Sequence, residues 1–282
     1  MKSLFDSKSL RLIAAGLVVI NGFFPAVWIL LTSLKTEAEL VSKPITYWPH
    51  NPTLANYVQA STDQPLLKSL GNSLAAASSA TVFPPLVASL AAYAIARLNL
   101  KNRQLILTCI VASSMFPLVT LLVPIFETMR TFGLLNSYTA LVLPYIVLNL
   151  PVCTLVLVSF FQSIPKDLEN AAMIDGCTRM GALVRVVVPL AAPGVFTAGI
   201  LAFVNSWDEF LLALSLNSNP NFRTLPVGIT LYQGEFTFPW PIISAALIVA
   251  IVPIAVLIAV FQARVVGGLT QGGLKGGSGM AS

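Results

Sequence analysis

Charged side chains gather in one short stretch of an otherwise apolar chain. Of the 282 residues, 56% are hydrophobic and 10% are charged, whereas soluble domains carry about 25% charged residues. Six charged residues lie close together: Lys166, Asp167, Glu169, Asp175, Arg179 and Arg185. Because both signs are mixed and small alanines lie among them, the stretch is suited to docking against another surface. An amphipathic connector at the level of the lipid headgroups would have the same composition.

Several kinds of chemistry are excluded by residues that the chain lacks. The single histidine, His50, has no second histidine or cysteine at ligand spacing, so we expect no metal site. No G-x-x-x-x-G-K-[ST] segment is present to hold ATP phosphates, and no G-x-S-x-G segment suggests hydrolysis. We therefore predict no catalytic residue and no cofactor on this chain. No nucleic-acid partner is expected, because the basic residues flank apolar segments.

A second polar group lies in the fifth apolar stretch. Asp208 and Glu209 follow Asn205 and Trp207, and Asp208 is about 17 residues, or roughly 26 Å, from the start of that stretch. Two interpretations stay open: an acidic pair that ends the membrane-embedded part, or a polar lining at the outer mouth of a solute path. Asn72, in the segment GNSLAAASSA, is open to close helix packing or to a substrate contact.

The elements that carry these residues are apolar stretches long enough to cross a membrane. A bilayer core of about 30 Å needs roughly 20 helical residues, and six stretches meet this length. They lie near residues 11–34, 68–96, 104–128, 138–161, 190–216 and 240–262. We therefore predict an all-α polytopic membrane protein with six transmembrane helices in a single domain over residues 1–276.

Lysine and arginine set the expected orientation. A cytoplasmic N-terminus would place 11 of the 16 basic residues inside and 5 outside. This excess follows the positive-inside rule. Both termini and the loop over residues 162–189 are therefore predicted to be cytoplasmic.

The loop over residues 162–189 is predicted to contain two short helices. Pro165 favours a helix start, and Gly176 favours a helix stop because glycine readily takes the left-handed conformation that ends many helices. Thr178 is placed to cap a second helix that runs through Leu183 towards Pro189. The loop would then present two short helices against the membrane.

The order of residues in this loop is specific. Asn170-Ala171-Ala172 is followed after three residues by Gly176, and after nine more by Val186-x-Val188-Pro189. This order resembles the EAA loop (EAA, x3, G, x9, I-x-LP) of permease subunits in bacterial ABC importers. Other segments are similar to the carbohydrate branch of these importers, such as the smaller permease subunit of the maltose system: ASLAAYAIARL, GLLNSYTALVLPY, NSWDEFLLAL and VGGLTQGGLKG. The family's glutamate is Asn170 here, with Glu169 one position earlier.

The resemblance implies a type I ABC importer permease fold with a cytoplasmic coupling helix. The coupling residues it implies are Glu169, Asn170, Ala171, Ala172, Asp175, Gly176 and Pro189. The partners it implies are a second permease subunit, two ATP-binding subunits that hold ATP and Mg, and an extracytoplasmic solute-binding protein. The substrate would be a sugar, and the location the bacterial inner membrane, in contact with lipid.

The tail GGLTQGGLKGGSGMAS is expected to be too rich in glycine to hold a helix. In the resembling family such a tail reaches between the ATP-binding subunits, which implies contacts by Gly272, Gly273 and Lys275. Residues 277–282 are interpreted as an added linker or tag remnant.

Two other classes of protein are alternatives to an importer permease. A self-sufficient secondary transporter of a small polar solute would need ion-coupling carboxylates near the centres of its spans and inverted repeats. An intramembrane enzyme would need a set of reactive side chains. The sequence has neither signature, so the importer permease is the preferred prediction and these two classes stay as alternatives.

Overall fold

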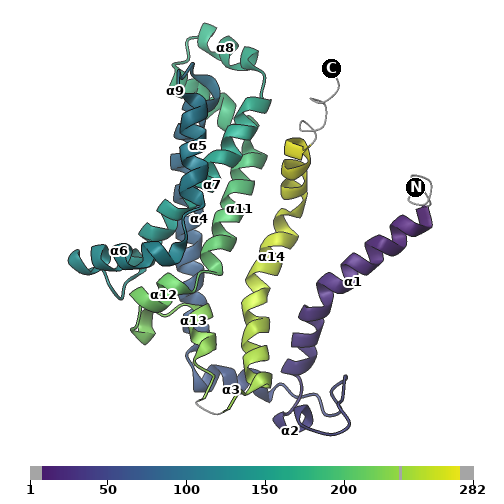
Figure 1. The fold of residues 1–282 in the computed structure, drawn as a ribbon. Helices are drawn as coiled ribbons and strands as arrows, with labels where there is room; N and C mark the ends of the chain where they lie inside the picture. The colour runs from purple at the N-terminus through teal and green to yellow at the C-terminus, as the bar shows by residue number, and fades with distance from the viewer. Residues whose placement is uncertain (1–7, 235–236, 274–282) are drawn as a thin grey trace. The chain divides into compact units, whose positions relative to one another are not determined.

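The computed structural model describes residues 8–234 and 237–273, and all regular elements in these ranges are helices. The chain forms two compact parts. The first part comprises residues 1–67 and 228–253, and the second comprises residues 68–227 and 254–282. Figure 1 labels most of the helices of both parts.

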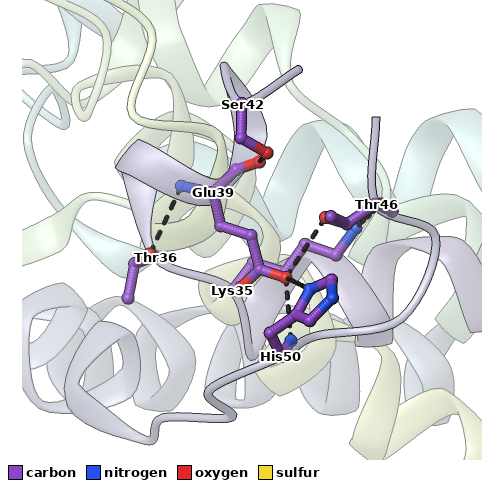
Figure 2. A network of polar contacts seen from close by, with 6 residues as sticks. All are labelled: Lys35, Thr36, Glu39, Ser42, Thr46 and His50. Carbon is purple, nitrogen blue, oxygen red and sulfur yellow. Dashed lines mark hydrogen bonds and ion pairs between the residues drawn. The ribbon is translucent and has the colours of Figure 1, made fainter. Parts of the chain in front are cut away.

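The first part contains one long apolar helix and two short helices of the following loop. Its elements are α1 (Lys8–Ser33), α2 (Glu37–Leu40), α3 (Ala55–Asp63) and the beginning of α14 (Trp240–Gly273). Polar contacts hold the segment after α1 in place (Figure 2). The buried Lys35 ammonium donates to the Thr46 carbonyl and lies 5.3 Å from the centre of the Trp28 ring. Glu39 accepts from the Thr46 hydroxyl and from the His50 amide.

The second part contains the residues of functional interest. Its elements are α4 (Leu66–Arg97, in this part from residue 68), α5 (Arg103–Ser114), α6 (Leu118–Thr131), α7 (Tyr138–Ser163), α8 (Lys166–Ile174), α9 (Arg179–Ala182), a π-helix (Leu183–Val187), α10 (Val188–Leu190), α11 (Ala192–Trp207), α12 (Leu211–Leu216) and the start of α13 (Leu225–Thr230). Helices α7 and α11 pack side by side (Figure 1). Gly194 permits this approach, because a Cβ there would lie 2.3 Å from Cγ of Phe160.

The six predicted spans correspond to four continuous helices and two bent pairs. The continuous ones are Leu12–Ser33, Leu66–Arg97, Tyr138–Ser163 and Trp240–Phe261. The pair Arg103–Ser114 and Leu118–Thr131 bends by 85°, and the pair Arg179–Leu190 and Ala192–Trp207 bends by 78°. The polytopic all-α prediction is therefore confirmed, with six spans if each bent pair counts as one.

Two of the predicted spans are interrupted by breaks between helices. The span near 104–128 breaks between α5 and α6, where Pro117 is the N-cap of α6. Proline disfavours helical geometry in the residue before it, so Phe116 cannot easily continue α5. The span near 190–216 ends at Trp207 and resumes at Leu211 as α12.

The expectation of a non-helical tail is wrong in part. Helix α14 continues through Gly272 and Gly273. Each glycine costs a helix only about 1 kcal/mol relative to alanine, and a helix that has already begun gains one hydrogen bond for each residue added. Lys275 and residues 277–282 lie outside the described residues.

Candidate functional site

The turn that ends α8 gives the cytoplasmic loop a defined shape. Gly176 has φ +91°, as its predicted role as a helix stop requires. The Gly176 amide donates to the Met173 carbonyl at 3.1 Å, and the Cys177 amide donates to the Ala172 carbonyl at 2.9 Å. These two bonds form a Schellman motif, which satisfies the last carbonyls of the helix.

The second short helix of the loop also begins where the sequence predicts. The Thr178 hydroxyl accepts a hydrogen bond from the Gly181 amide at 3.1 Å, so Thr178 is the N-cap of α9. A π-helix and α10 then lead to Pro189, which is exposed. The predicted pair of helices is thus confirmed, and the bend before α11 turns the chain from this loop into a span.

Glu169 is buried, unlike the other charged residues of the loop. Its side chain is 9% exposed, and its Oε2 lies 3.3 Å from Nε of Arg97, whose side chain is 3% exposed. Tyr93 donates its hydroxyl proton to Oε1 of Glu169, and Arg97 also donates to the Ile164 carbonyl at 2.9 Å. The carboxylate therefore ties α8 to the end of α4, inside this chain. The sequence prediction of a direct coupling contact did not anticipate this, although Tyr93 and Arg97 are four residues apart on one helix face.

The other predicted coupling residues lie at the surface. Asn170, Ala171, Asp175 and Gly176 are exposed, and Ala172 is partly exposed. Large apolar side chains accompany them, with these exposed fractions: Leu168 46%, Ile174 86%, Met180 56% and Val184 59%. A helix pair that exposes this much apolar surface beside charged groups has the character of a docking site.

A second polar site lies where two spans are broken. A cavity of about 200 Å³ is lined by polar side chains from α7 and from the region around the α11–α12 break, and by residues flanking the α5–α6 break. The lining residues are Ser114, Leu118, Tyr145, Leu148, Asn149, Asn205, Ser206 and Glu209. Irregular backbone within a membrane is tolerated where protein buries it or where it lines a polar cavity.

Hydrogen bonds arrange the side chains of this polar cavity. Glu209 caps α12, because its carboxylate oxygens accept from the amides of Leu212 at 2.7 Å and Ala213 at 3.1 Å. Tyr145 donates to the same carboxylate at 2.9 Å. The exposed Asn205 donates to the Asn149 side chain at 3.2 Å. Amide, hydroxyl and carboxylate groups thus converge on one cavity; Asn149 and Tyr145 were not singled out in the sequence.

Three residues that were predicted to line a solute path differ in their exposure and in their hydrogen bonds. Trp207 is 3% exposed and stacks on Phe203, so its ring is not accessible on this chain for sugar stacking or as a headgroup anchor. Asp208 is exposed beside the break. Asn72 is buried: its amide donates to two carbonyls, one of them Arg223 at 2.9 Å, and it accepts from the Tyr138 hydroxyl. These bonds support the packing role of Asn72.

The sequence pattern of a known family covers most of this region. Residues 85–270 match the family described as binding-protein-dependent transport system inner membrane component. The chain belongs to this family. It is therefore a multi-pass inner membrane component of a transport system, as the order of residues in the loop predicted, and a self-sufficient secondary transporter is not favoured.

Relatives of known role are similar over nearly the whole chain. The sulfoquinovosyl glycerol transport system permease protein SmoH of Agrobacterium fabrum is 71% identical over 98% of this chain and 97% of its own length. The trehalose/maltose transport system permease protein MalG of Thermococcus litoralis is 37% identical over 95% of this chain and 96% of its own. These relatives are permease subunits of sugar importers.

Solved structures have the same fold. A chain from a bacterial ABC transporter that imports the acidic polysaccharide alginate superposes with a TM-score of 0.75, at 19% identity, over 91% of this chain and 97% of that chain. A second structure of a bacterial alginate ABC transporter, in complex with a pentasaccharide-bound periplasmic protein, gives a TM-score of 0.63 at 17% identity, over 92% of this chain and 96% of that chain. The predicted importer-permease fold is therefore confirmed.

Proposed function

We propose that this chain is one of two permease subunits of an ATP-driven importer for a sugar or a small glycoside. The names of its relatives support this substrate class, because they include carriers of sulfoquinovosyl glycerol and of trehalose or maltose. The observation that carries the proposal is the α8 helix, which a buried ion pair and a Schellman turn hold in place while its outer face stays exposed.

The loop is proposed to couple this chain to an ATP-binding subunit. Asn170, Ala171, Ala172 and Asp175 would contact that subunit, and Gly176 would fix the angle at which α8 is presented. Motion of α8 would then reach α4 through the Glu169–Arg97 ion pair, because a buried pair of charges resists separation more than a surface pair does. ATP and Mg would be bound by two partner subunits, and this chain would catalyse no reaction of its own.

The polar cavity beside the two helix breaks is proposed to face the solute path. Its amide and hydroxyl groups match the hydrogen-bonding capacity of a sugar, and Asn205, Asp208 and Glu209 lie at or beside it. Discontinuous helices commonly form solute sites in transporters. A second permease subunit would complete the path, and an extracytoplasmic solute-binding protein would deliver the sugar.

The proposed topology has both termini in the cytoplasm. It rests on the excess of lysine and arginine in the segments that would then lie inside. The loop from Lys166 to Pro189 would face the cytoplasm, where the ATP-binding subunits are. The roles of Gly272, Gly273 and Lys275 as contacts to these subunits stay part of the proposal.

Site-directed cross-linking tests the coupling role. Ala171→Cys would be placed in a Cys177→Ala background of the complete transporter, and membranes would be treated with a thiol–amine cross-linker. We expect capture of the ATP-binding subunit, identified by mass spectrometry. Ser61→Cys, at an exposed position of α3 in the predicted outer segment, is the matched control and should capture no ATP-binding subunit.

The opposite pattern of labelling would refute the coupling role. If a membrane-impermeant thiol reagent added from outside labelled position 171 and spared position 61, the proposed orientation would be wrong.

The substrate class has its own test, in which ATPase activity of the transporter is measured with each solute presented on its binding protein. Stimulation by sulfoquinovosyl glycerol, trehalose or maltose is expected, and stimulation only by a non-carbohydrate solute would overturn the sugar assignment.

A further inference from the structure

A basic pocket lies at the end of α4, apart from the polar cavity and from the exposed face of α8. Its volume is about 300 Å³, and it is lined by residues 95–101, Arg103 and Lys166. Four of these residues are cations: Arg97, Lys101, Arg103 and Lys166. We call this site the basic pocket.

Only one of the four cations is neutralised within the described part of the chain. Arg97 is paired with Glu169. Lys101, Arg103 and Lys166 are exposed and form no ion pair with any residue that the structure describes. Three positive charges therefore face one pocket without a counterion from these residues, which is the electrostatic requirement for an anion site.

The N-terminal end of one helix adds to the positive potential of the basic pocket. Arg103 is the first residue of α5 and Lys166 is the first residue of α8. Neither helix has a side-chain hydrogen bond at its N-cap, but Asp167 and Glu169 lie in the first turn of α8 and oppose its positive end, whereas the first turn of α5 has no acidic residue. The N-terminal end of α5 therefore reinforces the three cations, and it would carry no site alone.

The basic pocket is also partly apolar, which narrows the kind of anion. Leu98 and Leu100 line it together with the cations, and both side chains are only partly buried. A soluble phosphate has no apolar group that could contact these leucines, whereas a lipid headgroup is joined to a glycerol backbone and acyl chains that could. An amphiphilic anion fits this lining best.

The position of the basic pocket relative to the spans favours a lipid. Arg97 is the last residue of a membrane-spanning helix, and Arg103 begins the next one. Residues at such ends lie at the level of the phospholipid headgroups. We propose that the basic pocket binds the phosphate-bearing headgroup of an anionic phospholipid.

Native mass spectrometry of the complete purified transporter tests this binding. Phosphatidylglycerol or phosphatidylcholine is added to the wild type and to the Lys101→Gln, Arg103→Gln, Lys166→Gln triple variant. We expect the retained phosphatidylglycerol to fall about fivefold for each charge removed, with phosphatidylcholine unchanged. The triple variant Lys43→Gln, Lys68→Gln, Arg130→Gln loses the same net charge elsewhere and should retain phosphatidylglycerol like the wild type.

Three results would overturn the proposal. Equal retention of phosphatidylglycerol by the wild type and the first variant would show that the basic pocket binds no lipid. Displacement of the lipid by inorganic phosphate would assign the site to a soluble anion. Loss of the ATP-binding subunit from the first variant, with lipid retention unchanged, would assign these cations to a protein interface.

Amine labelling of the wild-type transporter gives a measurement that does not depend on a variant that folds. Phosphatidylglycerol should protect Lys101 and Lys166 from acetylation and leave Lys43 reactive. Equal labelling with phosphatidylglycerol and phosphatidylcholine would contradict the assignment. Both experiments report on lipid alone, so their failure would leave the sugar-import proposal untouched.

Discussion

Two glutamates of the second part of the chain are held in different ways. Glu169, in the cytoplasmic loop, is bonded by Tyr93 and paired with Arg97. Glu209, at the α11–α12 break, is bonded by Tyr145 and by two backbone amides of α12. Each carboxylate thus accepts a hydrogen bond from one tyrosine. Glu169 is held in addition by a cation, whereas Glu209 is held by the first amides of a helix.

The difference separates a mechanical role from a binding role. The cation that holds Glu169 comes from a helix more than seventy positions earlier in the sequence, so the pair joins α8 to α4. The amides that hold Glu209 are local, and its carboxylate still lines the polar cavity. Glu169 therefore fixes the position of one helix against another, whereas Glu209 shapes a surface that a solute can meet.

The largest expected effect comes from breaking the ion pair. Arg97→Met leaves Glu169 as a buried charge without its cation, which should destabilise this part of the chain by about 3–5 kcal/mol. We expect a lower unfolding temperature and less transport per ATP hydrolysed. Arg185→Met, at an exposed position of the same loop, is the control. Equal unfolding temperatures for the two variants would contradict the claim that the Glu169–Arg97 pair fixes α8 against α4.

A smaller effect is expected at the other glutamate. Glu209→Ala removes the cap of α12 and the Tyr145 bond, which should cost about 1–2 kcal/mol. Uptake should fall more than this stability loss explains, since the polar lining is also lost. Glu127→Ala, at an exposed position of α6 outside the cavity lining, serves as the control in transport assays and unfolding measurements. If uptake by the Glu209 variant stays normal, the cavity is not on the solute path.

Gly176→Ala tests whether the turn at the end of α8 helps to position this helix in addition to the ion pair. Nothing lies within 4 Å of the added Cβ, so the cost is the backbone strain of the left-handed conformation, about 1–2 kcal/mol. We expect looser coupling, measured as more ATP hydrolysed per sugar imported. Gly71→Ala, in a helix with equally open space, should leave coupling unchanged. Identical coupling in both variants would mean that the ion pair alone positions α8.

The smallest effect concerns a third carboxylate, in the loop of the first part. The amide of His50, which donates to Glu39 at 2.8 Å, is the main cause that lowers the pKa of Glu39 below its ordinary value of 4.5. A carboxylate with a lowered pKa stabilises the folded loop above its unfolded pKa, and this contribution is lost as the pH falls through the folded pKa. Hydrogen exchange in residues 36–50 should therefore speed up below about pH 4.5 relative to Glu39→Gln. An identical pH response in that variant would contradict this role.

Local features of the loop could be predicted because their causes are local. Gly176 ends α8 and Thr178 caps α9, as their residue types indicate. The loop was also recognisable from the spacing of its small residues. Backbone preferences and capping depend on a few neighbouring positions, so one sequence is enough to infer them.

Features that depend on distant residues were missed. The burial of Glu169 follows from Arg97, which sequence spacing alone does not connect to the loop. The stacking of Trp207 on Phe203 and the bonds of Asn72 likewise depend on how helices pack. The break at Pro117 has a local cause, because proline acts on the residue directly before it.

The π-helix from Leu183 to Val187 sets the rotational phase between the loop and the span that follows. A π-turn holds an extra residue compared with the α-helical ladder around it. Deleting one residue there would let the backbone return to α-helical hydrogen bonds and keep the residues after Val187 close to their present orientation, whereas α-helical bonds through all five residues would rotate them by about 100° relative to α9. Homologous chains that lack the extra residue and form a continuous α-helix here would therefore present the same side of the fifth span to their partner.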